Sequence, residues 1–224
     1  MFEAAPSNNA ASQIKTTLFL ASSSAMRAAL LRQIGLVFTV IPTVEDPPRL
    51  THESPESYVQ RSALTKLEAG LQHLGTKSHP YAVIAADTLI KAPDGHILGK
   101  PIDRNNALAM LGSLSANKHQ VLSGIAFSVQ SKTRFHLNVN DVWFRAVSNE
   151  ESEICWESGE MADRAGGYAL QGRAALQGRA AAFIQHVEGS CSGIMGLPLY
   201  ELMNMFHDAG LKMLADGSLS GPSV

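Results

Sequence analysis

The feature that most constrains the fold is the alternation of short apolar runs with helical segments that carry their own start and stop signals. Residues 18–21 form an apolar run that ends at three serines, and a helical pattern then extends from Ala25 to a stop signal at Gly35. A second helix begins after Ser54, where a proline occupies the first helical position, and continues to about Leu74. Strands and helices that alternate in this way predict a single α/β unit.

The rest of the chain predicts further strands, including a hairpin at the Asp-Gly turn of residues 94–95. The other expected elements are strands at 37–41, 81–86, 121–129, 135–147 and 183–187, a helix from Asp103 to 114, a helix to about 157 with a Ser148–Glu151 capping box, and a last helix at 198–209. Their order favours a mixed central sheet that is flanked by helices.

The two ends of the chain and one internal repeat stand apart from this order. Residues 1–16 are rich in Ala, Ser and Asn without an apolar period, so we expect a flexible N-terminal extension, a folded domain over 17–214 and a flexible tail over 215–224. The six residues at 169–174 are repeated at once at 175–180. A repeat of this length is too short for a solenoid, and we interpret it as a local duplication in a loop or at a helix end.

Composition excludes several classes of function. The 224 residues contain 18 Lys and Arg against 20 Asp and Glu, which is not the basic excess that nucleic-acid binding requires. No apolar run is long enough to cross a bilayer and no basic leader is present, so we expect a cytoplasmic protein without a membrane partner. Cys155 and Cys191 are far apart, and no two histidines have the spacing of a zinc hydrolase, so a small-molecule ligand is favoured.

Two candidate cation positions lie near the first two helices. The serines at 22–24, between a strand and a helix, combine with Arg27 as a possible anion site, although Ser24 could simply cap the helix. Lys66 shares a helix face with apolar residues, including Val59 and Ala63. Its ammonium could contact a phosphate, or its stem could lie on the core while the charge reaches water.

Carboxylates complete the set of chemically useful side chains. Asp87 follows an apolar strand, where ligands of α/β proteins gather, and Lys100 lies on a constrained Gly-Lys-Pro loop. Glu45 and Asp46 form a pair of hard-oxygen donors that suits Mg²⁺ or Mn²⁺. Each of these residues could also be an ordinary turn or surface residue. Together, cations for a polyphosphate and carboxylates for a metal and a water are what phosphoryl-type hydrolysis requires.

The order of these motifs resembles the Maf family from about residue 18 to residue 211. The residues that carry the resemblance are Leu20-Ala21-Ser22-Ser23-Ser24-Ala25-Met26-Arg27, the acidic pair, Glu53-Ser54-Pro55 with Arg61 and Lys66, Ala86-Asp87-Thr88, Leu98-Gly99-Lys100-Pro101, Ser158-Gly159-Glu160 and Gly196-Leu197-Pro198-Leu199. The resemblance implies a nucleoside triphosphate pyrophosphatase that releases a nucleoside monophosphate and pyrophosphate with a divalent metal. It also implies a mixed α/β fold with a cleft between two lobes, and a homodimer.

The resemblance also assigns roles to individual residues. Asp87 is similar to the essential carboxylate of the family, which accepts a proton from water. The phosphate loop would comprise Ser22, Ser24 and Arg27, while Lys66 and Lys100 would contact phosphate oxygens and stabilise the leaving pyrophosphate. Glu45 or Asp46 would hold the metal.

Base preference depends on fewer positions. Thr88 and Gln171 are similar to residues of the branch that prefers dTTP and UTP. The phosphate loop departs from the Ser-Pro-Arg-Arg pattern of the family, because Met26 replaces an arginine that is linked to base choice and cannot donate as arginine does. The duplication offers Gln177 as a second candidate, and we favour Gln171. The alternatives are the same chemistry on a modified or methylated nucleotide, or a weakly catalytic regulator of cell division, as the association of the family with septum formation suggests.

Overall fold

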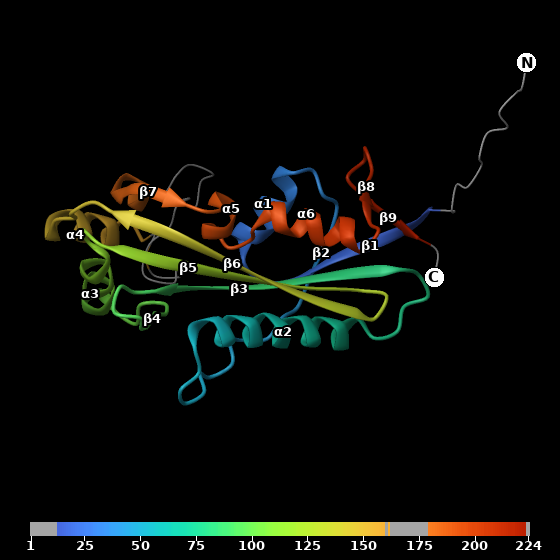
Figure 1. The fold of residues 1–224 in the computed structure, drawn as a ribbon, viewed down its shortest axis with the longest axis horizontal. Coiled ribbons are helices and arrows are strands. Elements are labelled where there is room, and N and C mark those ends of the chain that lie inside the picture. The colour runs from blue at the N-terminus through green and yellow to red at the C-terminus, as the bar shows by residue number, and fades with distance from the viewer. Residues whose placement is uncertain (1–12, 160, 162–178, 223–224) are drawn as a thin grey trace, which may run out of the picture.

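The described part of the chain is organised around one mixed sheet (Figure 1). The computed structural model describes residues 13–159, 161 and 179–222. The sheet has nine strands in the order β7-β6-β5-β3-β1-β9-β8, with β2 paired to β1 and β4 paired to β3. The strands are β1 (Gln13–Ala21), β2 (Thr39–Ile41), β3 (Tyr81–Lys91), β4 (Ile97–Leu98), β5 (Lys118–Val129), β6 (Lys132–Phe144), β7 (Ile184–Glu188), β8 (Lys212–Met213) and β9 (Leu219–Pro222). The predicted mixed sheet flanked by helices is confirmed.

Helices cover both faces of this sheet (Figure 1). The helical elements are α1 (Ala25–Gln33), α2 (Pro55–Leu74), α3 (Arg104–Leu114), α4 (Asn149–Glu157), the 3-10 helix η2 (Arg179–Phe183), α5 (Cys191–Ile194) and α6 (Leu199–Asp208). The long helix α2 lies along one face, while α1 and α6 lie on the other. The cap positions predicted from the sequence are confirmed, since Ser54 and Asp103 accept backbone N–H groups and Ser148 forms a capping box with Glu151.

The hydrophobic core is divided between the two faces and the two ends of the sheet. Between the sheet and helices α1 and α6, a cluster includes Leu20, Ile84 and Phe127, whereas Ala85 belongs to the cluster under α2. A separate cluster fills the end near α3 and α4. Burial on both faces explains why β3 is a continuous apolar run rather than an alternating one. Helix α2 comes close to the sheet at Gly70, where an added Cβ would lie 2.7 Å from that of Ala21.

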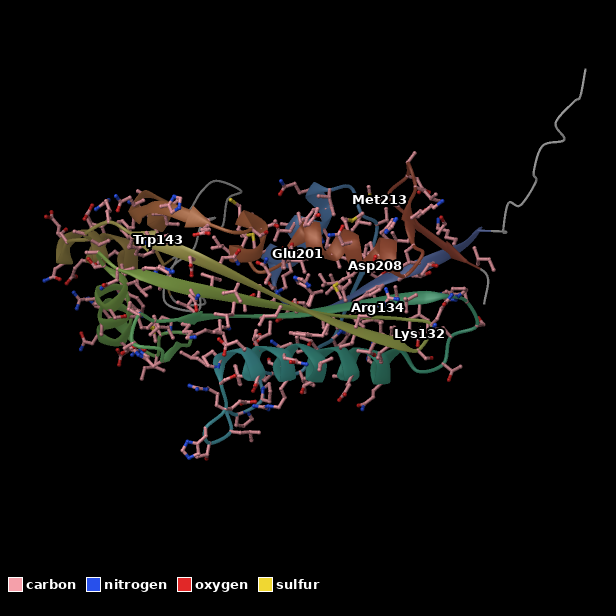
Figure 2. All side chains as sticks on the ribbon, viewed as in Figure 1. Lys132, Arg134, Trp143, Glu201, Asp208 and Met213 are labelled. Atoms are coloured by element: carbon pink, nitrogen blue, oxygen red, sulfur yellow. The ribbon has the colours of Figure 1, made fainter. Side chains whose placement is uncertain are left out.

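Strand β6 runs along the length of the sheet (Figure 2). Lys132 and Arg134 lie near one end of the molecule and Trp143 near the other, while Glu201 of α6 lies over the middle. There Asn138 Nδ2 donates a hydrogen bond of 2.8 Å to Glu201 Oε1. This contact ties α6 to the same strand that pairs with β5 and β7.

The edge of β3 is open over a short stretch. The parallel ladder from β1 ends where Leu20 faces Ile84, and the antiparallel ladder from β4 begins where Leu98 faces Ile90. Between these points β3 pairs with β5 on one side, and none of the described strands pairs with its other side. The segment that follows β1 and the loop that follows β4 therefore reach this open edge from opposite ends.

Several sequence-based expectations are corrected by the structure. The flexible tail predicted for residues 215–224 is wrong as far as 222, because β9 pairs antiparallel with β1 and Leu219 is buried. Strand β1 also begins at Gln13, so the extension predicted for 1–16 overlaps a strand. Strand β1 pairs with β3 on one side and with β2 and β9 on the other, and the pairing with β9 joins segments far apart in the sequence, so it has no local signal. Strand β3 does not end before Asp87 but continues to Lys91.

Candidate active site

On the α2 face of the open edge, one lysine contacts two carboxylates. Lys66 is buried because it lies on the side of α2 that faces the sheet, and its Nζ is 2.6 Å from Asp87 Oδ1. The same Nζ forms an ion pair with Asp46, which lies in the segment between β2 and α2. The side chains of Lys66 and Asp87 are below 10 % exposed, whereas that of Asp46 is 54 % exposed. The alternative in which Lys66 extends into water does not hold.

On the α1 face, a buried arginine donates to three different acceptors. Arg27 Nε donates to the Gly196 carbonyl at 2.9 Å, Nη1 to Ser22 Oγ at 3.3 Å and Nη2 to Thr88 Oγ1 at 3.1 Å. Burial lowers the pKa of Arg27, while the nearby carboxylates of Asp87 and Asp46 act in the opposite direction. This guanidinium is therefore a cation in a fixed orientation.

The serines of the predicted phosphate loop have different roles. Ser24 is the N-cap of α1, and its Oγ accepts the Arg27 backbone N–H at 3.4 Å. Ser22 Oγ accepts both the Ser24 backbone N–H at 3.2 Å and the Arg27 guanidinium. The capping interpretation of Ser24 is correct, and Ser22 connects the loop to Arg27.

The two faces meet at the open edge because neighbouring residues of a strand point to opposite sides of the sheet. Asp87 contacts Lys66 of α2, and the next residue, Thr88, contacts Arg27 of α1. Lys100 follows β4 by two residues and reaches the edge from its other end. The Lys100 side chain is exposed, and no hydrogen bond or ion pair joins it to another described residue.

Three predicted residues stand outside this cluster or outside the described chain. Glu45 is exposed in the segment that carries Asp46. Met26 is half-buried and packs against the core cluster on the α1 face, which provides an apolar role for a side chain that cannot donate. Gln171, like Gln177 and the first copy of the duplication, lies outside the described residues.

A salt bridge anchors the segment that carries Asp46. Arg61 on α2 donates to both Glu53 oxygens, at 2.6 and 2.7 Å, and to the Pro48 carbonyl at 2.9 Å. The hydrogen bond from Arg61 holds the pKa of Glu53 at about 2, and the Leu50 backbone N–H also favours the charged form. These contacts fix the segment to α2 at Arg61, which lies less than two helical turns before Lys66.

Sequence reasoning missed three residues near the open edge. Ser123 is fully buried on β5, and its Oγ is 2.9 Å from Thr88 Oγ1. Gly196 supplies the carbonyl that Arg27 needs. Tyr58 lies in the first turn of α2, and burial together with the carboxylates of Asp46 and Asp87 raises its pKa. Two of them had a signal in the sequence: Ser123 is a polar residue within the apolar run of β5, and Gly196 begins the Gly-Leu-Pro-Leu motif.

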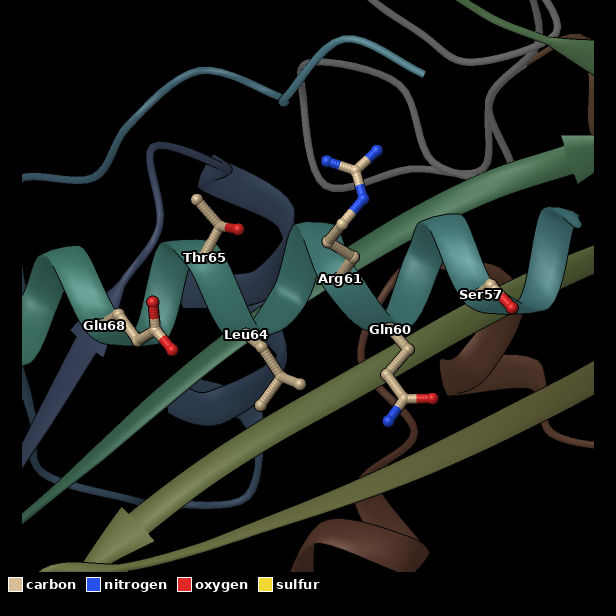
Figure 3. Close-up of a pocket in the computed structure, with 6 residues that line it drawn as sticks. All are labelled: Ser57, Gln60, Arg61, Leu64, Thr65 and Glu68. Atoms are coloured by element: carbon tan, nitrogen blue, oxygen red, sulfur yellow. The ribbon is translucent and has the colours of Figure 1, made fainter. Parts of the chain in front are cut away.

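A hollow of about 390 Å³ lies along α2, but it is separate from the charged cluster (Figure 3). Its lining residues are Ser57, Gln60, Arg61, Leu64, Thr65 and Glu68. None of them is Lys66, Asp46 or Asp87, and Arg61 is engaged by Glu53. The open edge of β3 is therefore the better candidate for chemistry.

Two described carboxylates can be tested as donors for a divalent metal. Asp46 and Asp87 converge on one ammonium, so their oxygens come within a few ångströms of each other. One or two carboxylates together with substrate phosphates are the usual ligands of Mg²⁺. The described residues contain no group of three or more His, Cys, Asp or Glu that could hold a metal by themselves. The donor set fits a metal that is shared with a phosphate ligand.

The fold and the site define an α/β protein in which a buried lysine with two carboxylates and a buried arginine lie on opposite faces of one open strand edge. A family model for Maf-like proteins matches residues 17–209, and the chain belongs to the Maf family. Among the described residues, no helix has the length and apolar character that a membrane span requires.

Curated relatives are similar over most of this chain. A dTTP/UTP pyrophosphatase of Aromatoleum aromaticum is 40 % identical over 211 residues, which cover 89 % of this chain and 98 % of the relative. One of Nitrosomonas europaea is 40 % identical over 205 residues, covering 88 % and 96 %. One of Aliivibrio fischeri is 36 % identical over 194 residues, covering 87 % and 98 %. A solved structure of a nucleoside-triphosphatase / dITP/XTP pyrophosphatase of Mycobacterium abscessus is 15 % identical and has a TM-score of 0.35. The match covers 58 % of this chain and 73 % of that one, and it is too distant to bear on function.

Proposed function

We propose that this protein is a nucleoside triphosphate pyrophosphatase that hydrolyses dTTP and UTP to the monophosphate and pyrophosphate. Relatives with that activity in their names align over nearly their whole length. The observation that carries the proposal is the position of Asp87, which lies between the Lys66 ammonium and the open strand edge that Arg27 and Lys100 approach. The function is removal of triphosphates from the nucleotide pool.

In this mechanism Asp87 accepts the proton of the attacking water. The water oxygen bonds to the α-phosphorus, the bond between this phosphorus and the bridging oxygen breaks, and pyrophosphate leaves with the electron pair. Arg27, Lys66 and Lys100 would stabilise the negative charge of the phosphates and of the leaving group. Ser22 would help to hold Arg27 in place.

Asp46 is the residue that would hold Mg²⁺ or Mn²⁺ together with the substrate phosphates, and the metal would supply charge neutralisation for the phosphate oxygens. Asp46 is favoured over Glu45 because it reaches Lys66 from a segment that is fixed to α2. A homodimer in the cytoplasm, without nucleic-acid or membrane partners, stays a prediction from the sequence.

A panel of triphosphates assayed with Mg²⁺ and with Mn²⁺ tests the proposal. It should include dTTP, UTP, dCTP, CTP and methylated purine triphosphates, with pyrophosphate and orthophosphate measured separately. We expect pyrophosphate and the monophosphate, fastest from dTTP or UTP. Release of orthophosphate and a diphosphate would contradict the reaction, and a preference for a methylated purine would move the activity to another substrate. The absence of turnover on every member would favour a regulatory protein.

A further inference from the structure

Thr88 is the residue through which β3 can contact a ligand on the α1 face. From Ala82 to Ile90 all residues of β3 are buried except Thr88, which is partly exposed. Its Oγ1 accepts from Arg27 Nη2 at 3.1 Å and lies 2.9 Å from Ser123 Oγ on the neighbouring strand. The two hydroxyls face each other because Thr88 and Ser123 are register partners in the β3–β5 ladder.

The direction of the hydrogen bond between these hydroxyls follows from the next contact. Ser123 Oγ is 2.7 Å from the Gly193 carbonyl, which can only accept, so Ser123 donates its single hydrogen there. Two hydroxyl oxygens 2.9 Å apart need one hydrogen between them, so Thr88 donates to Ser123, which is nearer than its other acceptor, the Gly196 carbonyl at 3.5 Å. Thr88 has then used its only hydrogen, and what it can offer a ligand is a lone pair.

The Gly193 carbonyl, which accepts the Ser123 hydrogen, is held in place. An added Cβ on Gly193 would lie 2.1 Å from Asn138 Oδ1, so the backbone is in close contact with β6. The Gly193 backbone N–H donates to Ser190 Oγ at 3.0 Å, and the Ser190 backbone N–H donates to Asn140 Oδ1 at 2.6 Å. With Gly193 fixed, the Ser123 hydrogen has no competing orientation of equal quality.

We propose that Ser123 is a specificity-determining positioning residue, which keeps the Thr88 hydroxyl as a hydrogen-bond acceptor toward the nucleobase. The inference rests on the proposed function and adds the direction of one hydrogen bond, in which Thr88 accepts and the base donates. Uracil and thymine present a ring N3–H donor, which matches the lone pair of Thr88. Cytosine presents a lone pair at the same ring position, so two acceptors would face each other in a desolvated contact.

The test measures binding rather than turnover. The probes are the α,β-methylene analogues of UTP and CTP, which cannot be cleaved at the bond in question, and their dissociation constants are measured by calorimetry. We expect the full-length wild-type chain to bind the uridine analogue more tightly and Ser123→Ala to reduce this preference by about tenfold, since the Thr88 hydrogen then keeps only the longer contact of 3.5 Å with the Gly196 carbonyl and can turn to the ligand. Ser128→Ala, a buried serine of the same strand, is the matched control and should keep the wild-type preference.

A double substitution separates this role from a merely structural one. Thr88→Val should also remove the preference, and adding Ser123→Ala in that background should change it no further. Should Ser123→Ala fail to fold, Thr88→Val alone decides. An unchanged preference in either single variant, or equal binding of both analogues by the wild type, would overturn the inference. Pyrophosphate release from UTP by the same wild-type preparation reports separately on the proposed function.

Discussion

The two faces of the sheet at the open edge of β3 differ in how their polar groups are held. On the α2 face, Lys66 forms ion pairs with buried Asp87 and with Asp46, which is more than half exposed. On the α1 face, Arg27 is bound to a backbone carbonyl and two hydroxyls, without a carboxylate among these hydrogen-bond acceptors. The first face contains charges that a ligand or a metal can rearrange, and the second contains neutral partners in fixed orientations.

On the proposed function, this difference assigns the chemistry to Asp87 and the recognition of the base to the next residue, Thr88. Asp87 has an ion-pair partner that a phosphate could share, whereas Thr88 has its hydrogen committed through Ser123. A group that acts as an acid or base must gain or lose a proton during the reaction, whereas a group that recognises a ligand must keep its hydrogen in one place. The account therefore predicts different consequences when each face is altered.

The largest effect is expected from Lys66→Met, which removes the cation shared by Asp46 and Asp87. Because Asp87 is left buried without its ion pair, we expect a loss of about 3–5 kcal/mol in the free energy of unfolding. Turnover should fall by about a thousandfold. Chemical denaturation and pyrophosphate release measure the two effects, and Lys91→Met, which alters the Lys91–Glu56 pair on the same strand and helix, is the control. Near-normal turnover in Lys66→Met would contradict the role of this face.

A smaller effect is expected from Arg27→Lys. Lysine keeps the charge but cannot reach the Gly196 carbonyl, Ser22 and Thr88 in the planar geometry of a guanidinium. We expect kcat/KM to fall by about a hundredfold, measured by steady-state kinetics. Arg32→Lys on the same helix, where Arg32 lies over the Phe38 ring, is the control and should stay near wild type. Equal activity of the two variants would show that the orientation of the Arg27 fork is unimportant.

Lys100 tests whether the open edge is a ligand site at all. Its side chain is exposed and no hydrogen bond or ion pair joins it to another described residue, so Lys100→Met should leave the melting temperature within about 2 °C of wild type. If Lys100 contacts phosphate, KM should rise by about tenfold. Lys132→Met at the far end of β6 is a control for general charge effects (Figure 2). A wild-type KM in Lys100→Met would remove this residue from the site.

The smallest effect on activity is expected at His119 near the start of β5, whose ring packs edge-on against Phe144. Burial lowers the pKa of His119 to about 4, below its ordinary value of 6.5. Between these values the unfolded chain binds the proton and the folded chain does not, so His119 makes the protein lose up to about 3 kcal/mol of stability as the pH falls from 6.5 to 4. His119→Gln should reduce this loss and leave turnover unchanged. Denaturation curves at pH 7 and pH 4.5 measure it, and an unreduced loss would contradict the assignment.

Local signals predicted most of the helices because their determinants lie within a few residues. Ser54 with the following proline fixed the start of α2, Ser148 with Glu151 fixed the start of α4, and the Asp-Gly turn at 94–95 joined β3 to β4. The pairing of β9 with β1 was missed, because it depends on segments about two hundred residues apart.

The site was predictable in its residue types and less so in its geometry. Asp87 was expected after a strand but lies inside β3, where Lys66 stabilises a residue that strands otherwise disfavour. The sequence marks Ser123 as a polar residue in an apolar run but could not assign its role, because that role depends on the register that places it opposite Thr88. Arg27 and Lys66 were identified individually, but their positions on opposite faces of one edge required the sheet order.

The central claim is that the Asp87 carboxylate accepts the proton of the attacking water at this edge. Asp87→Asn keeps the size of the side chain and an oxygen for Lys66, so we expect normal folding by circular dichroism and binding of the α,β-methylene dTTP analogue within about threefold of wild type. Pyrophosphate release from dTTP should fall by about a thousandfold, while Asp141→Asn, a carboxylate paired with Lys118, should be unaffected. Wild-type turnover in a folded Asp87→Asn protein would contradict the account.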